Sequence, residues 1–309
     1  AFAWVLRKFM NISGSEGLVA AGNIFMGMTE SPVLIKNYLP TMNRSEIFLV
    51  MVSGMGTIAG SVMGTYIGML GGTDPAAKVL FATHLLSASV MAVPGSIVLA
   101  KMLCPQTEEA TDHVAISGKE KENSNILDAI SSGTVTGVKL MTNIAAMLLV
   151  FISLVALANY ITEGVIGRYT GLNDWIVKIT DGKAQGLTFQ FILGVITSPF
   201  MWLIGVPSQD IMLVGSLLGQ KTILNEFVAY FQLQQWKDAG LFMYEKSILM
   251  STYILCGFAN ISSIGILLGG LGVLAPEKRG LISRIGLPAM IGGALVSVLS
   301  ATIIGMILG

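Results

Sequence analysis

The chain has 309 residues, of which 53% are hydrophobic and 12% charged, and its mean hydropathy is +0.74. Soluble domains average about 25% charged residues, and several apolar stretches reach the roughly 20 residues that cross a bilayer, so a soluble globular protein is excluded. The 18 basic and 18 acidic side chains balance, which argues against nucleic-acid binding because that requires a basic surface.

The chain begins AFAWVLRKFM without an initiator methionine, which predicts that it is part of a longer protein. Residues 1–12 carry Arg7 and Lys8 within an apolar stretch and are expected to form a helix in the membrane interface. Long apolar stretches further on predict helices that span the bilayer. The predicted spans are 47–71, 78–103, 139–161, 247–274 and 285–308.

The segments between these spans are more polar. Residues 104–125 are the most polar stretch and predict a solvated linker, and residues 163–182 mix apolar and charged side chains, as interfacial helices do. Segment 184–206 is apolar but contains Pro199, so the sequence leaves open whether it crosses the bilayer or bends against the other helices.

Two segments, 14–40 and 208–236, have apolar runs that are interrupted near the centre by polar groups, including a glutamate. Each predicts a re-entrant hairpin, in which a short helix enters the membrane, a polar tip follows, and a second helix leaves. A span rich in small residues follows each hairpin. Paired interrupted segments in corresponding places indicate a transporter with internal repeats and a binding site at mid-membrane. If 184–206 does not cross, the two hairpins open on opposite sides, which is an inverted repeat.

Glu30 and Glu226 are the strongest candidates for binding residues. A carboxylate deep in an apolar segment costs about 2.5–3.5 kcal/mol on insertion scales and is functional by default. Neutral polar side chains accompany the two glutamates in the repeats, namely Asn23, Thr29, Thr57, Asn225, Asn260, Ser262 and Ser263. This set suits an uncharged solute with several hydroxyl groups. It suits an anion poorly, because we expect no arginine or lysine to interrupt these core segments.

A sodium ion takes several oxygen ligands, and the unwound carbonyls of broken helices supply them beside side-chain oxygens. Asn23 and Thr57 could contribute to such a site. The sequence contains no P-loop, no HExxH motif and no nucleophile elbow, which argues against an enzyme. A membrane-embedded enzyme acting on a lipid-linked substrate is the least favoured alternative.

Five long motifs are similar to those of the concentrative nucleoside transporters, and the resemblance covers essentially the whole chain. They are GNIFMGMTESPVLI at 22–35, TIAGSVMGTYI at 57–67, LDAISSG at 127–133, NEFVAYFQL at 225–233 and CGFANISSIGILLGGLGVLAP at 256–276.

The resemblance implies an all-α integral membrane fold with a scaffold, a mobile transport domain and two opposed re-entrant hairpins. Residues 1–138 and 162–309 would then be the two halves of the transport domain, and 139–161 a scaffold helix through which three protomers meet. Further scaffold helices would precede residue 1.

The resemblance also implies residue roles. Thr29 and Glu30, with the neighbouring Met28, would face the base of a nucleoside, and Val62 and Phe258 would form apolar walls. Glu226, Asn260 and Ser263 would bind the ribose. The sodium site would take side-chain oxygens from Asn23 and Thr57 and backbone oxygens from Met26 and Ile58. Many family members have glutamine where this chain has Met28, which predicts an altered preference between purines and pyrimidines.

The predicted protein is therefore a secondary active symporter, a homotrimer of the cell (inner) membrane, that imports nucleosides by an elevator-type movement. Sodium is the favoured coupling ion, a proton is the alternative, and no cofactor is expected. A passive nucleoside facilitator or channel remains the alternative function.

Overall fold

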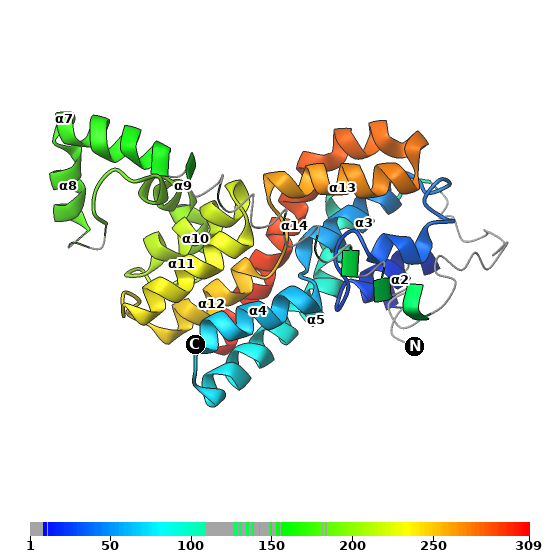
Figure 1. The fold of residues 1–309 in the computed structure, drawn as a ribbon, viewed down its shortest axis with the longest axis horizontal. Helices are drawn as coiled ribbons and strands as arrows, with labels where there is room; N and C mark the ends of the chain where they lie inside the picture. The colour runs from blue at the N-terminus through cyan, green and yellow to red at the C-terminus, as the bar shows by residue number, and fades with distance from the viewer. Residues whose placement is uncertain are drawn as a thin grey trace. The chain divides into compact units, whose positions relative to one another are not determined.

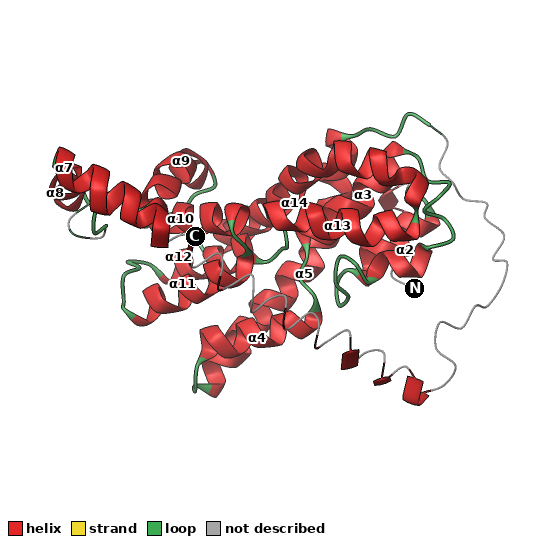
Figure 2. Cartoon of the chain, turned by 45° about the horizontal axis from the view of Figure 1, so that its top comes forward, coloured by secondary structure: helices red, strands yellow, loops and turns green. Residues whose placement is uncertain are grey.

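The computed structural model describes residues 9–10, 12–108, 156–180, 182 and 184–309, with isolated helical residues between 126 and 154. All regular elements in these residues are helical, which confirms the predicted all-α fold (Figure 2). The chain divides into two compact units, 1–114 with 192–309, and 115–191. Most of the predicted interfacial helix 1–12, linker 104–125 and scaffold helix 139–161 lies outside the described residues, and the domain boundaries at 138 and 162 remain predictions.

The first hairpin begins with helix α2 (Gly14–Gly22). Ser13 and Glu16 start this helix with a reciprocal capping box, which satisfies backbone N–H groups that otherwise have no helical partner. The returning arm is the short 3-10 helix η1 (Ser31–Ile35), which has Pro32 at its start and is followed by turns. The second arm of this hairpin is therefore helical as predicted, but it is a 3-10 helix of five residues and not an α-helix. Pro32 and Pro40 leave few residues between them for a longer helix.

The predicted span 47–71 is not one continuous helix. Asn43 and Glu46 form the capping box of α3 (Arg44–Gly56), and after a break at residues 57–59 the chain continues as α4 (Gly60–Gly71). Helix α5 (Pro75–Leu103) then runs for 29 residues from the cap residue Asp74. The break corrects the sequence prediction, since hydropathy measures how apolar a segment is and not whether its backbone is continuous.

The second half repeats this order (Figure 1). After α9 (Phe189–Leu203), the predicted second hairpin is formed by α10 (Ile211–Ile223) and α11 (Glu226–Asp238). The predicted span 247–274 is again broken, into α12 (Glu245–Leu255) and α13 (Ile261–Leu274). The short η3 (Pro276–Lys278) precedes α14 (Arg279–Ile307), which is 29 residues long like α5 and likewise contains an internal proline.

We define the first repeat as residues 14–103 and the second as residues 211–307. Three segments in the described residues are long and apolar enough to cross a membrane, namely Arg44–Gly71, Pro75–Leu103 and Pro276–Ile307. They correspond to the predicted spans 47–71, 78–103 and 285–308. The shorter apolar helices are Phe189–Leu203, Ile211–Ile223 and Ile261–Leu274.

Two hydrophobic clusters form the core of the larger unit, and each draws on both repeats. One contains the first hairpin, α3 and α13, and the other contains the second hairpin, α4 and α12. Helices α5 and α14 contribute to both clusters, and Phe258 packs against both. Each hairpin therefore packs with the second half of the broken helix that belongs to the other repeat.

The smaller unit contains the predicted interfacial segment 163–182. Its described part consists of a π-helix, η2 (Tyr160–Gly167), followed by α7 (Arg168–Thr170) and α8 (Leu172–Ile179). Gly171 separates the last two with φ +73, a backbone conformation that favours glycine. Helix α8 buries Ile176 and exposes Trp175 and Ile179. The helical prediction is confirmed for these residues, and their place in a membrane interface remains a prediction.

Candidate functional site

Glu226 is the first residue of α11, directly after the tip of the second hairpin, and its side chain is buried. Asn260 caps α13 and donates from Nδ2 to Glu226 Oε2 at 3.0 Å. The Oδ1 atom of Asn260 accepts from Ser263 N at 2.9 Å, Ser263 Oγ at 3.0 Å and Ser262 Oγ at 2.6 Å. The structure thus brings together the three residues predicted to bind ribose, and it positions Asn260 through Ser262 and Ser263.

Tyr66 of α4 completes this group. Its hydroxyl donates to Glu226 Oε1 at 3.3 Å, and its ring stacks on Tyr230 of α11 at a centroid distance of 4.1 Å. Tyr66 comes from the first repeat and Glu226 from the second. The sequence analysis missed Tyr66. A tyrosine within an apolar segment carries no local signal that it lies beside a glutamate 160 positions away.

The tip of the first hairpin, residues 23–30, contains the predicted base-contacting residues. Glu30 is exposed and its Oε2 accepts from Gly27 N at 3.0 Å. Thr29 packs against Gly270 of α13, because a Cβ added at Gly270 would lie 3.2 Å from the methyl group of Thr29. Met28 is 7% exposed and packs against Gly54, which has room for Met28 only because it lacks a Cβ. The Met28 side chain thus lies in the hydrophobic cluster that contains the first hairpin, α3 and α13.

Val62 and Phe258 lie next to the two helix breaks. Val62 is in the first turn of α4 and Phe258 is in the break between α12 and α13, and both are half-buried. The amide of Phe258 donates to Thr57 O at 3.2 Å, so the two breaks are hydrogen-bonded to each other. This bond joins the repeats at the point where both backbones leave the helical path.

Asn23 and Thr57 meet at Ser53. Asn23 Nδ2 donates to Ser53 Oγ at 2.9 Å, and Thr57 Oγ1 donates to the backbone oxygen of Ser53 at 3.0 Å. Ser31 Oγ donates to Asn23 Oδ1 at 2.6 Å. All four side chains are buried. The structure brings the two predicted cation-binding side chains together and adds Ser31 and Ser53, which the sequence analysis did not select.

The two predicted backbone ligands also suit a cation. Met26 lies in the tip of the first hairpin and Ile58 in the break after α3. In the part of the chain that the structure describes, no hydrogen bond ends on the carbonyl oxygen of either residue. Buried carbonyls are normally paired, and Ile58 is fully buried. Neutral oxygens of this kind are ligands that a sodium ion accepts.

Lys221 contradicts one prediction. It lies in the last turn of α10, within the second hairpin, and is fully buried. The expectation that no basic residue interrupts the core segments is therefore wrong. The sequence analysis missed it because a single lysine near a helix end is typical of a side chain that reaches back to water, and the burial of this one depends on the surrounding helices.

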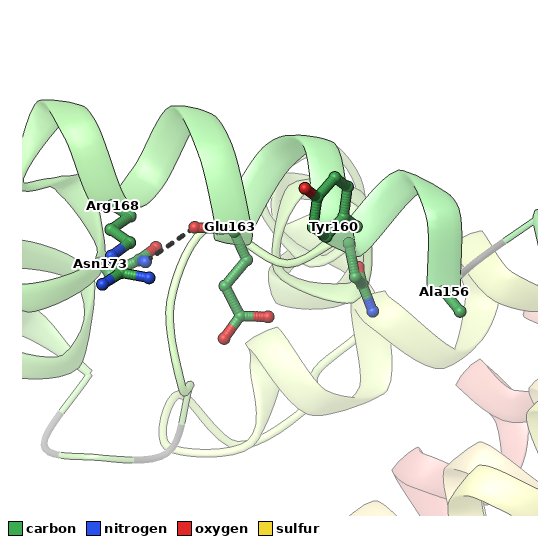
Figure 3. Close-up of a pocket in the computed structure, with 7 residues that line it drawn as sticks. Ala156, Tyr160, Glu163, Arg168 and Asn173 are labelled. Carbon is green, nitrogen blue, oxygen red and sulfur yellow. Dashed lines mark hydrogen bonds between the residues drawn. The ribbon is translucent and has the colours of Figure 1, made fainter.

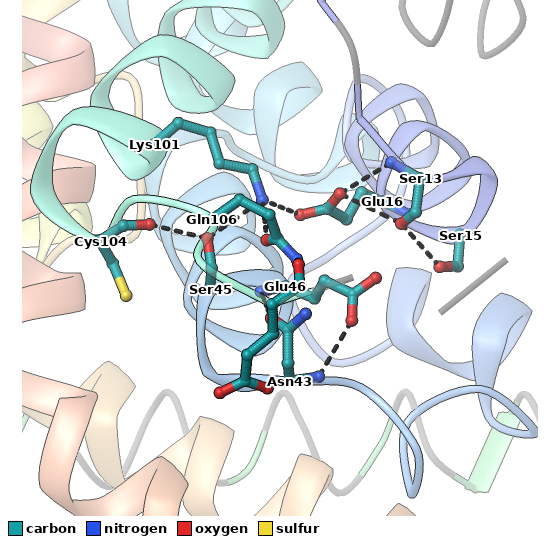
Figure 4. Close-up of polar contacts among 10 residues, drawn as sticks. Ser13, Ser15, Glu16, Asn43, Ser45, Glu46, Lys101, Cys104 and Gln106 are labelled. Carbon is teal, nitrogen blue, oxygen red and sulfur yellow. Dashed lines mark hydrogen bonds and ion pairs between the residues drawn. The ribbon is translucent and has the colours of Figure 1, made fainter. Parts of the chain in front are cut away.

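A partly buried ion pair joins the base of the first hairpin to α5 (Figure 4). Lys101 Nζ of α5 lies 2.6 Å from Glu16 Oε1 of α2, and the Glu16 side chain is 1% exposed. Lys101 also donates to Ser45 Oγ at 3.1 Å and to Gln106 Oε1 at 2.9 Å. The contacts tie α2 to the start of α3 and the end of α5.

A buried acid holds the base of the second hairpin in a corresponding place. Asp210 precedes α10 and is fully buried, and it accepts from Met243 N at 3.0 Å and from Tyr244 N at 3.1 Å. Tyr244 is the cap residue of α12. In each repeat, therefore, an acidic residue joins the base of the hairpin to the start of the following helix, through a lysine in the first and directly to backbone amides in the second.

A separate pocket of about 380 Å³ lies in the smaller unit beside η2 (Figure 3). Asn173 Nδ2 donates to Glu163 O at 3.0 Å at its edge, and Asn159 Oδ1 accepts from Phe189 N at 2.7 Å. The pocket contains none of the predicted site residues. Its lining residues are Ala156, Asn159, Tyr160, Glu163, Gly164, Arg168 and Asn173.

Two family models together match most of the chain. Residues 84–305 match the family model described as the C-terminus of Na+ dependent nucleoside transporters, and residues 1–73 match the model described as nucleoside recognition. The chain is 40% identical to the transporter YutK of Bacillus subtilis over 97% of its own length and 69% of that protein. It is 39% identical to sodium/nucleoside cotransporter 1 of Rattus norvegicus, over 99% of its own length and 46% of that protein.

Solved structures of CNTnw are similar to this chain. The inward-facing, substrate-bound structure superimposes with a TM-score of 0.85 at 36% sequence identity. The superposition includes 99% of this chain and 67% of the CNTnw chain. An outward-facing variant of CNTnw superimposes with a TM-score of 0.87 at 36% identity and covers 99% of this chain and 68% of that one.

Proposed function

The chain belongs to the sodium-dependent nucleoside transporter family, and from that premise we propose that it takes part in nucleoside import coupled to a cation gradient, with sodium as the coupling ion. The resemblance to concentrative nucleoside transporters is confirmed, and the family is one of membrane transporters, not of enzymes. The matched fold has a scaffold, a transport domain and hairpins.

The observation that supports a nucleoside most directly is the hydrogen-bonded group of Glu226, Asn260 and Tyr66. A carboxylate accepts hydrogen bonds, and an amide both donates and accepts them, so together they match two neighbouring ribose hydroxyls. Val62 and Phe258 supply apolar surface for a base, and Thr29 and Glu30 supply polar contacts to its edge. Sodium/nucleoside cotransporter 1 of the rat, by its name, carries such solutes.

The cation is proposed to bind at Asn23 and Thr57, with the backbone oxygens of Met26 and Ile58. Such a cation would join the tip of the first hairpin to the break after α3 and so fix the hairpin that carries Thr29 and Glu30. A solute that requires this ordered tip binds more tightly when the cation is present, and the coupling is reciprocal.

Transport is proposed to follow an elevator-type movement, in which the loaded transport domain crosses the bilayer against the scaffold. CNTnw has been solved in inward-facing and outward-facing states, which supports alternating access for a chain of the same fold. We propose that three protomers assemble through residues 139–161 and that the protein is located in the inner, or cell, membrane.

The base preference is proposed to differ from that of relatives with glutamine at the position of Met28. A thioether cannot supply the paired donor and acceptor of an amide. The Met28 side chain packs against Gly54. The base site of this chain would therefore lack the amide group that glutamine supplies in those relatives. Competition uptake with all common nucleosides tests this proposal, and equal inhibition by every nucleoside would contradict it.

The central experiment is uptake of radiolabelled uridine and adenosine into proteoliposomes that contain the full-length protein. An inward sodium gradient is expected to drive accumulation above the external concentration, and replacement of sodium by choline at fixed pH is expected to abolish it. Accumulation that follows a pH gradient instead would assign coupling to protons. Equilibration without accumulation would favour the passive facilitator.

Asn260→Ala tests the ribose site within the same assay. The substitution removes the donor to Glu226 and the acceptor for Ser262 and Ser263, so uptake should fall sharply while the protein still reaches the membrane. Wild-type uptake by this variant would remove Asn260 from the site.

A further inference from the structure

Lys221 is an unusual residue for its position. It is fully buried and, among the described residues, is the only lysine or arginine in the buried set. A charged side chain in the bilayer is costly and marks a functional site unless it is paired. Neither the ribose group nor the proposed cation site uses Lys221, so its burial needs another explanation.

Two neutral oxygens bind the Lys221 ammonium. Nζ donates to Ile254 O at 2.8 Å and to Ser297 Oγ at 2.8 Å. Ile254 lies in the last turn of α12, where the carbonyls have no following helical partner and carry the negative end of the helix dipole. Ser297 donates its own hydroxyl to Ala294 O, which leaves its oxygen lone pairs available to Lys221.

These contacts join three elements. Lys221 belongs to the first arm of the second hairpin, Ile254 to the helix that ends at the second break, and Ser297 to α14. The tip of the hairpin follows directly, and Glu226 is the first residue of the other arm. Lys221 and Glu226 therefore lie on the two arms of one hairpin, five positions apart in the chain.

The first repeat has a different arrangement in the corresponding place. Asn23 ends α2 at the tip of the first hairpin and contacts Ser53, one turn before the end of α3. In both repeats the end of the first hairpin arm is therefore tied to the last turn of the helix that precedes the break. The first repeat uses neutral amide and hydroxyl groups, and the second uses an ammonium group.

We propose that the Lys221 ammonium is a covalently tethered cation that does permanently in the second repeat what the exchangeable sodium ion does in the first. This inference rests on the proposed function. Lys221 is then a positioning residue that holds α10 on α12 and α14 and sets the place of Glu226 and Asn260. Nucleoside affinity depends on Lys221, and the sodium requirement depends on the first repeat alone.

The test uses three variants, Lys221→Met, Lys221→Arg and Ser297→Ala, and a matched control. Lys221→Met keeps the length of the side chain and removes its charge, and Ser297→Ala removes one of its two acceptors. Ser300→Ala is the control, because Ser300 is buried one turn further along α14 and its hydroxyl bonds only to Val296 O of its own helix. Uptake of uridine and adenosine is measured in proteoliposomes as a function of nucleoside and of sodium.

Lys221→Met and Ser297→Ala should each raise the KM for both nucleosides about tenfold, as expected for the loss of a buried hydrogen bond to a charged group. At saturating nucleoside, where the coupling between the two ligands no longer depends on nucleoside affinity, the half-saturating sodium concentration should stay within about twofold of wild type, because the two sites share no partner. Lys221→Arg should recover part of the affinity that Lys221→Met loses. Ser300→Ala should match wild type in every measurement.

Equal KM values for Ser297→Ala and Ser300→Ala would overturn the proposal, as would a shift in the half-saturating sodium concentration measured at saturating nucleoside. If Lys221→Met does not fold, the two serine variants decide. Absence of uptake by the wild-type protein would refute the proposed function instead. The ligand-free protein then still tests the anchor, since Ser297→Ala should lower its melting temperature more than Ser300→Ala, and equal temperatures would refute the anchor.

Discussion

The two repeats share one order of elements but stabilise their centres differently. In the second repeat, Asn225 caps α11 and Asn260 caps α13 with side-chain hydrogen bonds, and Lys221 binds the end of α12. In the first repeat, η1 and α4 begin without a side-chain cap, and neutral groups surround Asn23.

The difference concerns how firmly each hairpin tip is held. The second hairpin tip is held by its own side chains, and the buried carboxylate of Glu226 is already hydrogen-bonded to Tyr66 and Asn260. The first hairpin tip is held by fewer charged contacts, and Glu30 is exposed. We infer that the second repeat provides a fixed ribose site and that the first repeat supplies the part whose order an external cation controls.

Among the substitutions that test this difference between the repeats, Glu226→Gln should have the largest effect on nucleoside uptake. The substitution removes the negative charge and one acceptor oxygen, so the amide can accept from Asn260 only if Tyr66 turns from donor to acceptor, and both hydrogen bonds to a charged group are lost. We expect kcat/KM for nucleoside uptake to fall about 100-fold, which corresponds to about 3 kcal/mol for a hydrogen bond to a buried charged group. Initial uptake rates in proteoliposomes measure this effect.

Glu277→Gln is the control, because it makes the same chemical change at an exposed residue of η3. It should leave uptake unchanged. Wild-type rates in both variants would show that the second repeat does not bind the solute through its carboxylate.

Lys101→Met should have the next largest effect, on the base of the first hairpin. It leaves the buried carboxylate of Glu16 without its partner at 2.6 Å. Lys101 is 21% exposed, so we expect a loss of about 2 kcal/mol in unfolding free energy, below the 3–5 kcal/mol of a fully buried pair. Unfolding of the purified protein in detergent measures the loss.

The surface pair Lys237–Asp238, at 2.8 Å with Asp238 56% exposed, offers the control. Lys237→Met should change the unfolding free energy by less than about 0.5 kcal/mol. Equal losses in the two lysine variants would mean that the Glu16 contact does not anchor the hairpin.

Ser53→Ala should have the smallest effect and should act on cation dependence. It removes the hydroxyl that accepts from Asn23 Nδ2, so Asn23 is less well oriented. We expect the half-saturating sodium concentration to rise about fivefold, or about 1 kcal/mol for one neutral hydrogen bond. A sodium titration of uptake at fixed nucleoside concentration measures the shift.

Ser96→Ala is the matched control, since Ser96 is equally buried and its hydroxyl donates only to Val93 O within α5. It should leave the sodium titration unchanged. The same sodium requirement in both serine variants would argue that the Asn23 group does not bind the cation.

The sequence alone determined the class of protein, the two hairpins and the candidate residues Glu226, Asn260, Asn23 and Thr57. These predictions rest on local properties, because an apolar run of sufficient length or a glutamate within such a run is visible in one segment. The helix breaks at 57–59 and 256–260 were missed for the same reason, since the apolar composition continues through them.

Packing between distant segments sets which of these residues have partners. Tyr66 meets Glu226 because α4 packs with the hairpin of the other repeat, and Ser53 meets Asn23 because α3 packs beside the first hairpin. Lys221 is buried because it packs against α12 and α14, whose Ile254 O and Ser297 Oγ accept its hydrogen bonds. Contacts between segments far apart in the chain depend on which helix faces meet, and hydropathy and capping signals within one segment do not contain that information.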